Sequence, residues 1–213
     1  VTEELRRRGH DVLVLSPDRF HSLPCPTYPE IRLALVGRRR IGRLLADYRP
    51  DAVHISTEGP LGWAARNWCV ARKQPFTTAY HTQFPDYLAR RTGLPASLFW
   101  PVIRRFHQPA SGIMVATETI REQLRAQGLT RLCHWGRGVD LANFGPDVAP
   151  PDLFFALPRP IQLYVGRVAV EKNVEAFLRN GHPGTKVVVG DGPALSRLQA
   201  EFPDAHFLGK QMG

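Results

Sequence analysis

An arginine and a lysine lie five residues apart in the stretch GRVAVEKN, which directly follows the apolar run IQLYV. Gly166 lets the backbone turn where this run ends. Arg167 offers a planar fork of hydrogen-bond donors, and Lys172 offers a mobile point charge. Cations at the start of a helix oppose its dipole by about 0.3–1 kcal/mol each, which is unfavourable unless an anion lies between them. This asymmetry is a physical reason to consider a diphosphate site, and two solvated charges at an ordinary turn remain the alternative.

Two further glycines follow the apolar run TKVVV, in the stretch GDGPA. Gly190 and Gly192 would permit a ligand to approach the backbone closely. Pro193 suits the first position of a helix. The stretch is not GxGxxG, so the dinucleotide-binding fingerprint is absent. A turn that borders a ligand and an ordinary strand-to-helix turn both remain open here.

Polar residues also follow apolar runs in the first half of the chain. His81 and Asp86 lie in HTQFPDYL, Glu58 lies in STEGPLG, and Arg137 stands between two glycines in WGRGVD. Ligands of open α/β sheets bind outside the carboxyl ends of the strands, so these residues are candidates for a binding site. The alternative is that they are polar loop residues. HExxH, paired cysteines and Asp-x-Asp do not occur, so we predict no metal site.

Short apolar runs alternate with amphipathic stretches along the chain. We expect strands at residues 11–16, 52–56, 75–80, 112–117, 131–135, 161–166, 185–190 and 205–209. We expect helices near residues 2–8, 38–48, 60–73, 97–108, 118–127, 172–180 and 193–201. Continuous apolar strands separated by helices are typical of a parallel sheet covered on both faces, which predicts a doubly wound α/β fold.

The alternation breaks once, in a proline-rich segment that indicates a linker. We therefore predict one domain at residues 1–145, a linker at 146–160 and the start of a second domain at 161–213. Residues 17–31 hold several prolines and are expected to form a long working loop within the first domain. Because the chain opens on a helix with no strand before it and stops just after a strand, we expect a fragment that lacks both ends.

The formal net charge is +9 and the sequence pI is about 10.1, which would suit nucleic acid or an anionic membrane surface. The basic residues come in short clusters without interleaved aromatic residues, so we do not expect nucleic acid as a partner. Solvated faces and a membrane surface remain open. No apolar run approaches the roughly 18–20 residues that span a bilayer. Three widely spaced cysteines, Cys25, Cys69 and Cys133, indicate a reducing compartment, the cytoplasm.

One predicted helix bears on the membrane question. The stretch PASLFWPVIRRFHQ, residues 95–108, combines large apolar residues with Arg104, Arg105 and His107. It could lie in a membrane interface, with a basic face and an apolar face. We favour the alternative, in which the apolar face packs on its own sheet, because Pro101 permits only a short or kinked helix.

Together, STEGPLG, YHTQFPDYL, GVDLANF, GRVAVEKN and VVVGDGP resemble, in order and spacing, the retaining glycosyltransferases of family 4. The likeness is greatest to the bacterial branch of lipid-directed sulfoquinovosyl-, glucosyl- and mannosyltransferases. The resemblance implies the GT-B fold, an α/β architecture in which two Rossmann-like domains with parallel sheets face a cleft; here the second domain would be incomplete. It also implies a nucleotide-sugar donor held mainly by the second domain, with no metal and no cofactor.

The resemblance also implies roles for individual residues. Arg167 and Lys172 would bind the donor diphosphate, and His81 would be the catalytic histidine beside the donor sugar. Three glycines would border the nucleotide: Gly166, Gly190 and Gly192. Three polar residues would line the cleft: Glu58, Asp86 and Arg137. The family's first strand with its glycine-rich loop and its Glu-x7-Glu motif are absent from the sequence. We therefore expect the chain by itself to be inactive.

The predicted reaction is the transfer of a hexose from a nucleotide-diphosphate sugar to an acceptor, with retention of configuration. The family branch makes a membrane lipid one candidate acceptor, with the enzyme peripheral on the inner face of the cell membrane. Two alternatives are a GT-B-like sugar-nucleotide epimerase, which would lack the GRVAVEKN arrangement, and a truncated, non-catalytic nucleotide-binding module. The sequence does not specify the base, the sugar, the acceptor or the oligomeric state.

Overall fold

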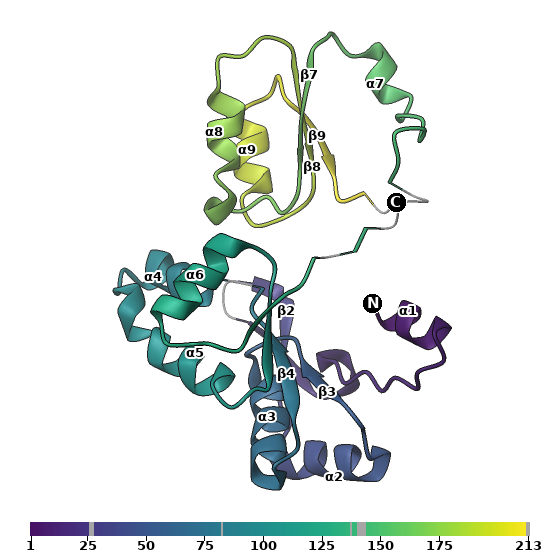
Figure 1. The fold of residues 1–213 in the computed structure, drawn as a ribbon. Coiled ribbons are helices and arrows are strands. Elements are labelled where there is room, and N and C mark those ends of the chain that lie inside the picture. The colour runs from purple at the N-terminus through teal and green to yellow at the C-terminus, as the bar shows by residue number, and fades with distance from the viewer. Residues whose placement is uncertain (26–27, 82, 137, 140–143, 212–213) are drawn as a thin grey trace. The chain divides into compact units, whose positions relative to one another are not determined.

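The chain forms two compact units, residues Val1–Gly138 and Val139–Gly213 (Figure 1). The computed structural model describes residues 1–25, 28–81, 83–136, 138–139 and 144–211. Within these residues, no helix has the length and apolar character needed to cross a membrane. The division into a first, acceptor-side domain at residues 1–145, a linker at 146–160 and a nucleotide-sugar-binding domain at 161–213 remains a prediction.

The first unit is built on a four-stranded parallel sheet in the order β3-β4-β5-β6. Its strands are β3 (Val53–Ile55), β4 (Phe76–Ala79), β5 (Gly112–Val115) and β6 (Leu132–His134). β4 and β5 lie in the middle and are almost wholly buried, as expected for strands covered on both faces. All four lie within ranges that the sequence predicts as strands.

Several helices pack around this sheet. The helical elements of the first unit beyond η1 (Pro17–Arg19) are α1 (Thr2–Arg7), which buries no residue, α2 (Arg38–Tyr48), α3 (Pro60–Arg72), α4 (Phe84–Thr92), η2 (Ala96–Leu98), α5 (Trp100–His107) and α6 (Glu118–Ala126). A proline occupies the first turn of α3, α4 and α5, where its missing N–H costs nothing. The Thr117 hydroxyl caps α6 by accepting a hydrogen bond from the backbone N–H of Ile120. The helices bury Ile41, Cys69, Ile103, Phe106 and Leu124 in the core.

Two predictions for the first 31 residues are wrong. Residues 11–16 form no strand, and Val14 is 41% exposed; an apolar run becomes a strand only where a neighbouring backbone pairs with it. Residues 17–31 are not a loop, because they contain η1 (Pro17–Arg19) and most of an antiparallel hairpin, β1 (Ser22–Cys25) with β2 (Tyr28–Ala34). In a two-stranded sheet both strands are edges, where proline is tolerated.

The second unit holds a three-stranded parallel sheet, β7 (Ile161–Val165), β8 (Thr185–Val189) and β9 (His206–Gly209). α8 (Val174–Arg179) and α9 (Leu195–Glu201) lie together beside it (Figure 1) and share its core. On β7 the side chains of Leu163 and Val165 are half or more exposed, so this strand is not covered on both faces within the described chain.

Two elements of the second unit differ from the predicted ones. A short helix, α7 (Leu153–Ala156), lies within the segment predicted as a linker. The helix expected from residue 172 begins at Val174, because Lys172 ends a 3-10 turn, η3 (Val170–Lys172), and Asn173 has a left-handed backbone with φ 48°.

Candidate functional site

Glu58 lies on the tight turn between β3 and α3. The turn packs closely against the helix that follows, because a Cβ on Gly62 would overlap the carbonyl oxygen of Thr57. Pro60 begins α3 immediately after the turn. The GPLG part of STEGPLG therefore has a structural role, because it fixes the backbone that carries Glu58 at the carboxyl end of β3.

A buried histidine orients the Glu58 carboxylate. His107, at the end of α5, is wholly buried, and its Nε2 lies 3.1 Å from Oε1 of Glu58. Its Nδ1 lies 2.8 Å from the Thr78 hydroxyl on β4. A carboxylate only accepts hydrogen bonds, so the Nε2–H group donates to Glu58, and Nδ1 is hydrogen-bonded to the Thr78 hydroxyl. Both ring nitrogens of His107 are thus paired, and the histidine holds Glu58 in place.

Tyr80 adds an unpaired phenol to this group. It directly follows β4 and is 3% exposed, and within the described part of the chain its hydroxyl has no hydrogen-bond partner. Burial is the main cause that raises the pKa of Tyr80, and the negative charges of Glu58 and Asp86 raise it further. Its ring meets the Trp100 and His107 rings. Tyr80 therefore stays protonated, as a hydrogen-bond donor near two carboxylates.

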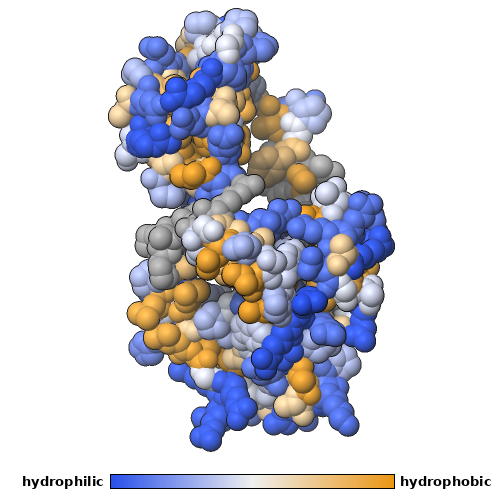
Figure 2. All heavy atoms as spheres, turned by 90° about the vertical axis from the view of Figure 1, so that its left-hand side faces the viewer, coloured by the Kyte–Doolittle hydropathy of each residue, from blue (hydrophilic) through white to orange (hydrophobic). Residues whose placement is uncertain are grey.

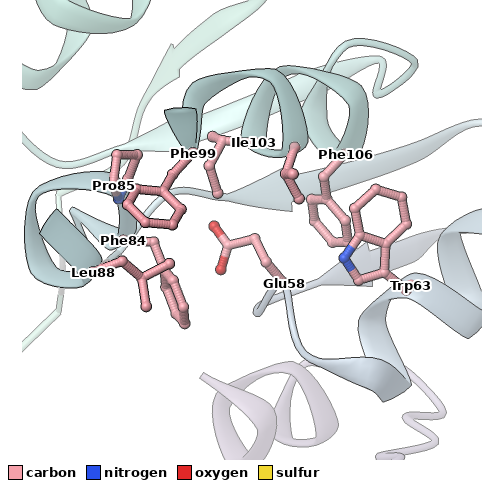
Figure 3. Close-up of a pocket in the computed structure, with 9 residues that line it drawn as sticks. Glu58, Trp63, Phe84, Pro85, Leu88, Phe99, Ile103 and Phe106 are labelled. Carbon is pink, nitrogen blue, oxygen red and sulfur yellow. The ribbon is translucent and has the colours of Figure 1, made fainter. Parts of the chain in front are cut away.

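An apolar pocket opens beside Glu58, with a volume of about 160 Å³. Figure 3 shows the Glu58 carboxylate in the middle of a ring of apolar side chains that come from α3, α4 and α5. The lining residues are Glu58, Trp63, Phe84, Pro85, Leu88, Phe99, Val102, Ile103 and Phe106. Glu58 is the single charged residue of this lining, and its side chain is 10% exposed.

His81, the predicted catalytic histidine, is exposed just beyond β4, next to Tyr80. Its ring centroid lies 5.1 Å from that of Trp135, which follows β6, and Trp135 also meets the ring of His54. The Thr77 hydroxyl is hydrogen-bonded to Nδ1 of His54 at 2.8 Å. Burial, followed by the charge of His81, lowers the pKa of His54. These three rings form a small aromatic cluster beside the sheet.

The other two predicted cleft residues of the first unit are Asp86 and Arg137. Asp86 is half-buried in the first turn of α4, and Nε2 of Gln123 on α6 lies 3.5 Å from its Oδ2. The negative charge of Asp86, like that of Glu58, raises the pKa of the Tyr80 phenol. Arg137 lies outside the described residues. Glu58 and Asp86 thus both act electrostatically on Tyr80, while His81 belongs to the aromatic cluster.

His107 was predicted to lie with Arg104 and Arg105 on the basic side of its helix, and for His107 this prediction is wrong. Both arginines are exposed, but His107 is buried with Ile103 and Phe106. The favoured interpretation, a helix whose apolar side packs on its own unit, agrees with this burial. The signal was available in the spacing, because positions 103, 106 and 107 share one side of a helix. Tyr80, Thr78 and Trp135 were also missed as members of these clusters.

In the second unit, the glycines after β7 and β8 pack their backbones against each other. Gly190 has φ 144°, and a Cβ there would overlap the carbonyl oxygen of Gly166. Gly192 has φ 157°, and a Cβ there would overlap the carbonyl oxygen of Val168. The backbone N–H of Val168 also donates to the carbonyl of Asp191 at 2.9 Å. The fold itself therefore requires these glycines; their place beside a nucleotide remains a prediction.

Arg167 and Lys172 lie on one loop after β7. Arg167 directly follows Gly166, and the hydroxyl of Tyr164 donates to its carbonyl oxygen at 2.9 Å, which fixes the start of the loop. Lys172 is exposed at the end of η3. The loop thus carries two cations beyond the carboxyl end of a strand of the parallel sheet, the position at which α/β proteins bind ligands. Their contact with a diphosphate remains a prediction.

Comparison with solved structures defines the class of fold. The chain is similar to the sucrose-phosphate synthase of Thermosynechococcus elongatus, with a TM-score of 0.66 and 20% identity over 82% of this chain and 49% of that chain. The fold is that of the GT-B glycosyltransferases, as the sequence predicted.

The family follows from the sequence comparisons. Residues 1–143 match the model of Glycosyltransferase Family 4, and the chain belongs to this family, as predicted. It is 31% identical to a GDP-mannose-dependent alpha-mannosyltransferase of Mycobacterium tuberculosis, over 100% of this chain and 62% of that protein. It is 26% identical to the alpha-monoglucosyldiacylglycerol synthase of Streptococcus pneumoniae, over 93% of this chain and 52% of that protein. The chain thus spans between half and two thirds of the length of these relatives.

Proposed function

We propose that this chain belongs to a glycosyltransferase that moves a hexose from a nucleotide-diphosphate sugar to an acceptor, with retention of configuration. The observation that carries this proposal is the family 4 match over residues 1–143, together with a mannosyltransferase relative whose name specifies GDP-mannose as its donor. In this proposal, Arg167 and Lys172 neutralise the charge that develops on the leaving nucleoside diphosphate. His81, next to Trp135, contacts the donor sugar.

Donor binding can be tested without turnover. Arg167→Ala and Lys172→Ala should each weaken the binding of GDP or UDP by about 1–3 kcal/mol, the range for charge-assisted hydrogen bonds. Calorimetry on the whole protein would measure both affinities. Arg39→Ala, at an exposed position of α2 in the other unit, is the matched control and should bind as the unchanged chain does. Unchanged affinity in both site variants would refute the diphosphate role.

We also propose that positive side chains take the place of a metal at the diphosphate, so that neither a metal nor a cofactor is needed. Glycosyl transfer by the whole protein should then persist in EDTA. Activity that is lost in EDTA and restored by Mg²⁺ would contradict this part of the proposal.

For the acceptor, we propose a lipid reached from an anionic membrane surface on the cytoplasmic side. One relative is named for the synthesis of alpha-monoglucosyldiacylglycerol, and the net charge is +9. Figure 2 shows hydrophobic residues gathered on the side of the first unit that carries α4 and α5. The exposed apolar residues of this segment are Phe84, Leu94, Leu98 and Val102, and Arg104 and Arg105 are exposed beside them.

Vesicle sedimentation tests the membrane surface. The chain should pellet with anionic vesicles and be released by rising salt, because surface attraction is screened within a Debye length of about 8–10 Å. Replacing Arg104 and Arg105 by Gln should reduce pelleting without changing nucleotide affinity. Replacing Arg38 and Arg39 by Gln removes the same charge from α2 and should have the smaller effect. Equal binding to neutral and anionic vesicles would favour a soluble acceptor.

A further inference from the structure

The pocket beside Glu58 has the size of a small organic group. A cavity of about 150 Å³ lined by aliphatic and aromatic side chains stays dry and takes up benzene, and this pocket measures about 160 Å³. The exposed side chains of Phe84 and Val102 are part of its lining, so it opens to the surface between α4 and α5. A compact alkyl or aromatic group could therefore enter without unfolding either helix.

A carboxylate at such a place is costly unless it is paired. Burial of a charged group is unfavourable in proportion to the hydrogen bonds that it loses from water. Within the described chain, His107 is the hydrogen-bond donor to Glu58, and it occupies Oε1 alone. An ionised carboxylate can accept several hydrogen bonds, so Glu58 retains acceptor capacity toward the pocket. The remaining lining supplies no charge to balance it.

We propose that this pocket binds the acceptor of the sugar, through a compact apolar group that carries a hydroxyl, and that the hydroxyl donates a hydrogen bond to Glu58. The inference rests on the proposed glycosyl transfer, whose acceptor must be an alcohol if the sugar is to be joined through oxygen. A charge-assisted O–H···O⁻ bond is about twice as strong as a neutral one, which makes Glu58 the group that selects alcohols over hydrocarbons.

The buried groups behind Glu58 fit this assignment. His107 fixes the carboxylate in one orientation through Thr78, so little side-chain freedom is lost when a ligand binds. His107 is a positioning residue, because its two ring nitrogens are taken up by Glu58 and Thr78. The buried hydroxyl of Tyr80 is a further donor near Glu58 and Asp86, at the same end of the sheet.

Simple probes test the pocket without nucleotide, sugar or membrane. Benzyl alcohol and toluene differ by one hydroxyl, and their binding to the 213-residue chain can be followed through the methyl NMR signals of Leu88 and Ile103. In a pocket without an acceptor, toluene would bind more tightly, because burying an unpaired hydroxyl is unfavourable. We expect benzyl alcohol to bind at least as tightly as toluene. Glu58→Gln keeps the shape but removes the charge, and should weaken benzyl alcohol relative to toluene by about five- to tenfold.

Two further variants keep the test decisive. Glu122→Gln, at an exposed position of α6, should leave both affinities unchanged. Val102→Trp fills the pocket from an exposed helix position and should abolish the binding of both probes even if Glu58→Gln fails to fold. The inference is overturned if neither probe binds the unchanged chain, or if toluene is strongly preferred. It is also overturned if Glu58→Gln leaves the preference unaltered.

The proposed function fails separately from the pocket. Suppose that Arg167→Ala and Lys172→Ala do not affect nucleotide binding while the probes behave as expected. The proposed donor site is then refuted, and the proposed acceptor pocket is retained. Glu58→Gln should leave the affinity for GDP and UDP unchanged, because Glu58 lies in the other unit. A loss of nucleotide affinity in this variant would contradict the assignment of the pocket to the acceptor.

Discussion

The carboxyl ends of the parallel strands are built by different means in the two units. After β3 and β4, function-bearing groups are held by side chains: His107 on α5 joins Glu58 to Thr78, and apolar residues of three helices surround the carboxylate. After β7 and β8, the loops are held by backbone atoms, with Gly190 against Gly166 and Gly192 against Val168. The cations Arg167 and Lys172 lie on one of these loops.

This difference determines how each site can fail and how it can be recognised. A backbone-packed turn tolerates no Cβ at its contact points, such as Gly190 against Gly166. A site built from side chains depends on particular residue types at each position, such as Glu58 and His107, which are separated by 49 positions. The first kind should break sharply at single glycines, and the second should lose stability in smaller steps.

The largest effect is expected at Gly190 of the second unit. Gly190→Ala would place a Cβ against the carbonyl oxygen of Gly166, at a backbone φ of 144° that L residues rarely adopt. Strain and overlap together should lower the free energy of unfolding of this unit by about 4 kcal/mol, the upper range for one substitution. Hydrogen exchange at the amides of β8 would report it. Gly181→Ala, where a Cβ meets nothing within 4 Å, is the control; equal protection in both variants would contradict the backbone-packing account.

A substitution at Gly62 tests the contrast between the units, because Gly62 is a glycine of the first unit that packs against backbone atoms. Gly62→Ala would push α3 away from the carbonyl of Thr57, next to Glu58, and should destabilise the first unit by about 3 kcal/mol. All four tryptophans, Trp63, Trp68, Trp100 and Trp135, lie in this unit, so their fluorescence during urea unfolding measures its stability alone. Gly37→Ala, in open space, should have little effect. A loss as large as that at Gly190 would show that the first site also depends on backbone packing.

The sequence predicted the parallel strands of both units because each is a short apolar run bounded by turn residues. It failed at residues 11–16, where an equally apolar run finds no pairing partner within the described chain, and at β1 and β2, where prolines suggested a loop. Pairing is decided by the neighbouring strand, which a local pattern does not contain. The fold class was nevertheless predictable, since it depends on the repeated alternation and not on any one element.

The candidate site was predictable to a similar degree. Gly166, Gly190 and Gly192 were predicted to lie on turns after strands, and they do, while their role in a site remains a prediction. Glu58 follows a strand, as predicted, but its partner His107 was assigned to the wrong side of a helix. The apolar pocket was not foreseen either, because its walls come from three helices, one of which, α4, was not predicted. Long-range side-chain contacts are the part that a single sequence does not encode locally.

The next largest loss of stability is expected from a substitution at His107. His107→Leu fills much of the same volume but leaves Glu58 and Thr78 without their buried partner, which should cost about 2–3 kcal/mol of stability in the first unit. Thr78→Val removes only the hydrogen bond to Nδ1 of His107 and leaves the bond to the carboxylate, so it should cost about 1 kcal/mol. Urea unfolding followed by tryptophan fluorescence measures both. If the two variants were equally stable, the bond between His107 and Glu58 would contribute nothing beyond packing.

The smallest effect is a pH dependence in the aromatic cluster of the first unit. The pKa of His54 is lowered in the folded chain, mainly by burial and then by the charge of His81, from an ordinary value of 6.5. The unfolded chain therefore takes up a proton at His54 at a higher pH than the folded chain does. The contribution of His54 to stability is fully present above pH 6.5 and declines as the pH falls toward its folded pKa.

Urea unfolding between pH 5 and pH 8 tests this assignment, with tryptophan fluorescence as the signal of the first unit. His54→Asn keeps a polar group near Thr77 but cannot be protonated, so it should flatten the decline below pH 6.5. His81→Asn removes only the secondary cause and should flatten the decline less. A larger change from His81→Asn than from His54→Asn would mean that charge, and not burial, governs this cluster. The pKa of His54 would then be set mainly by His81, the exposed histidine that we propose to contact the sugar.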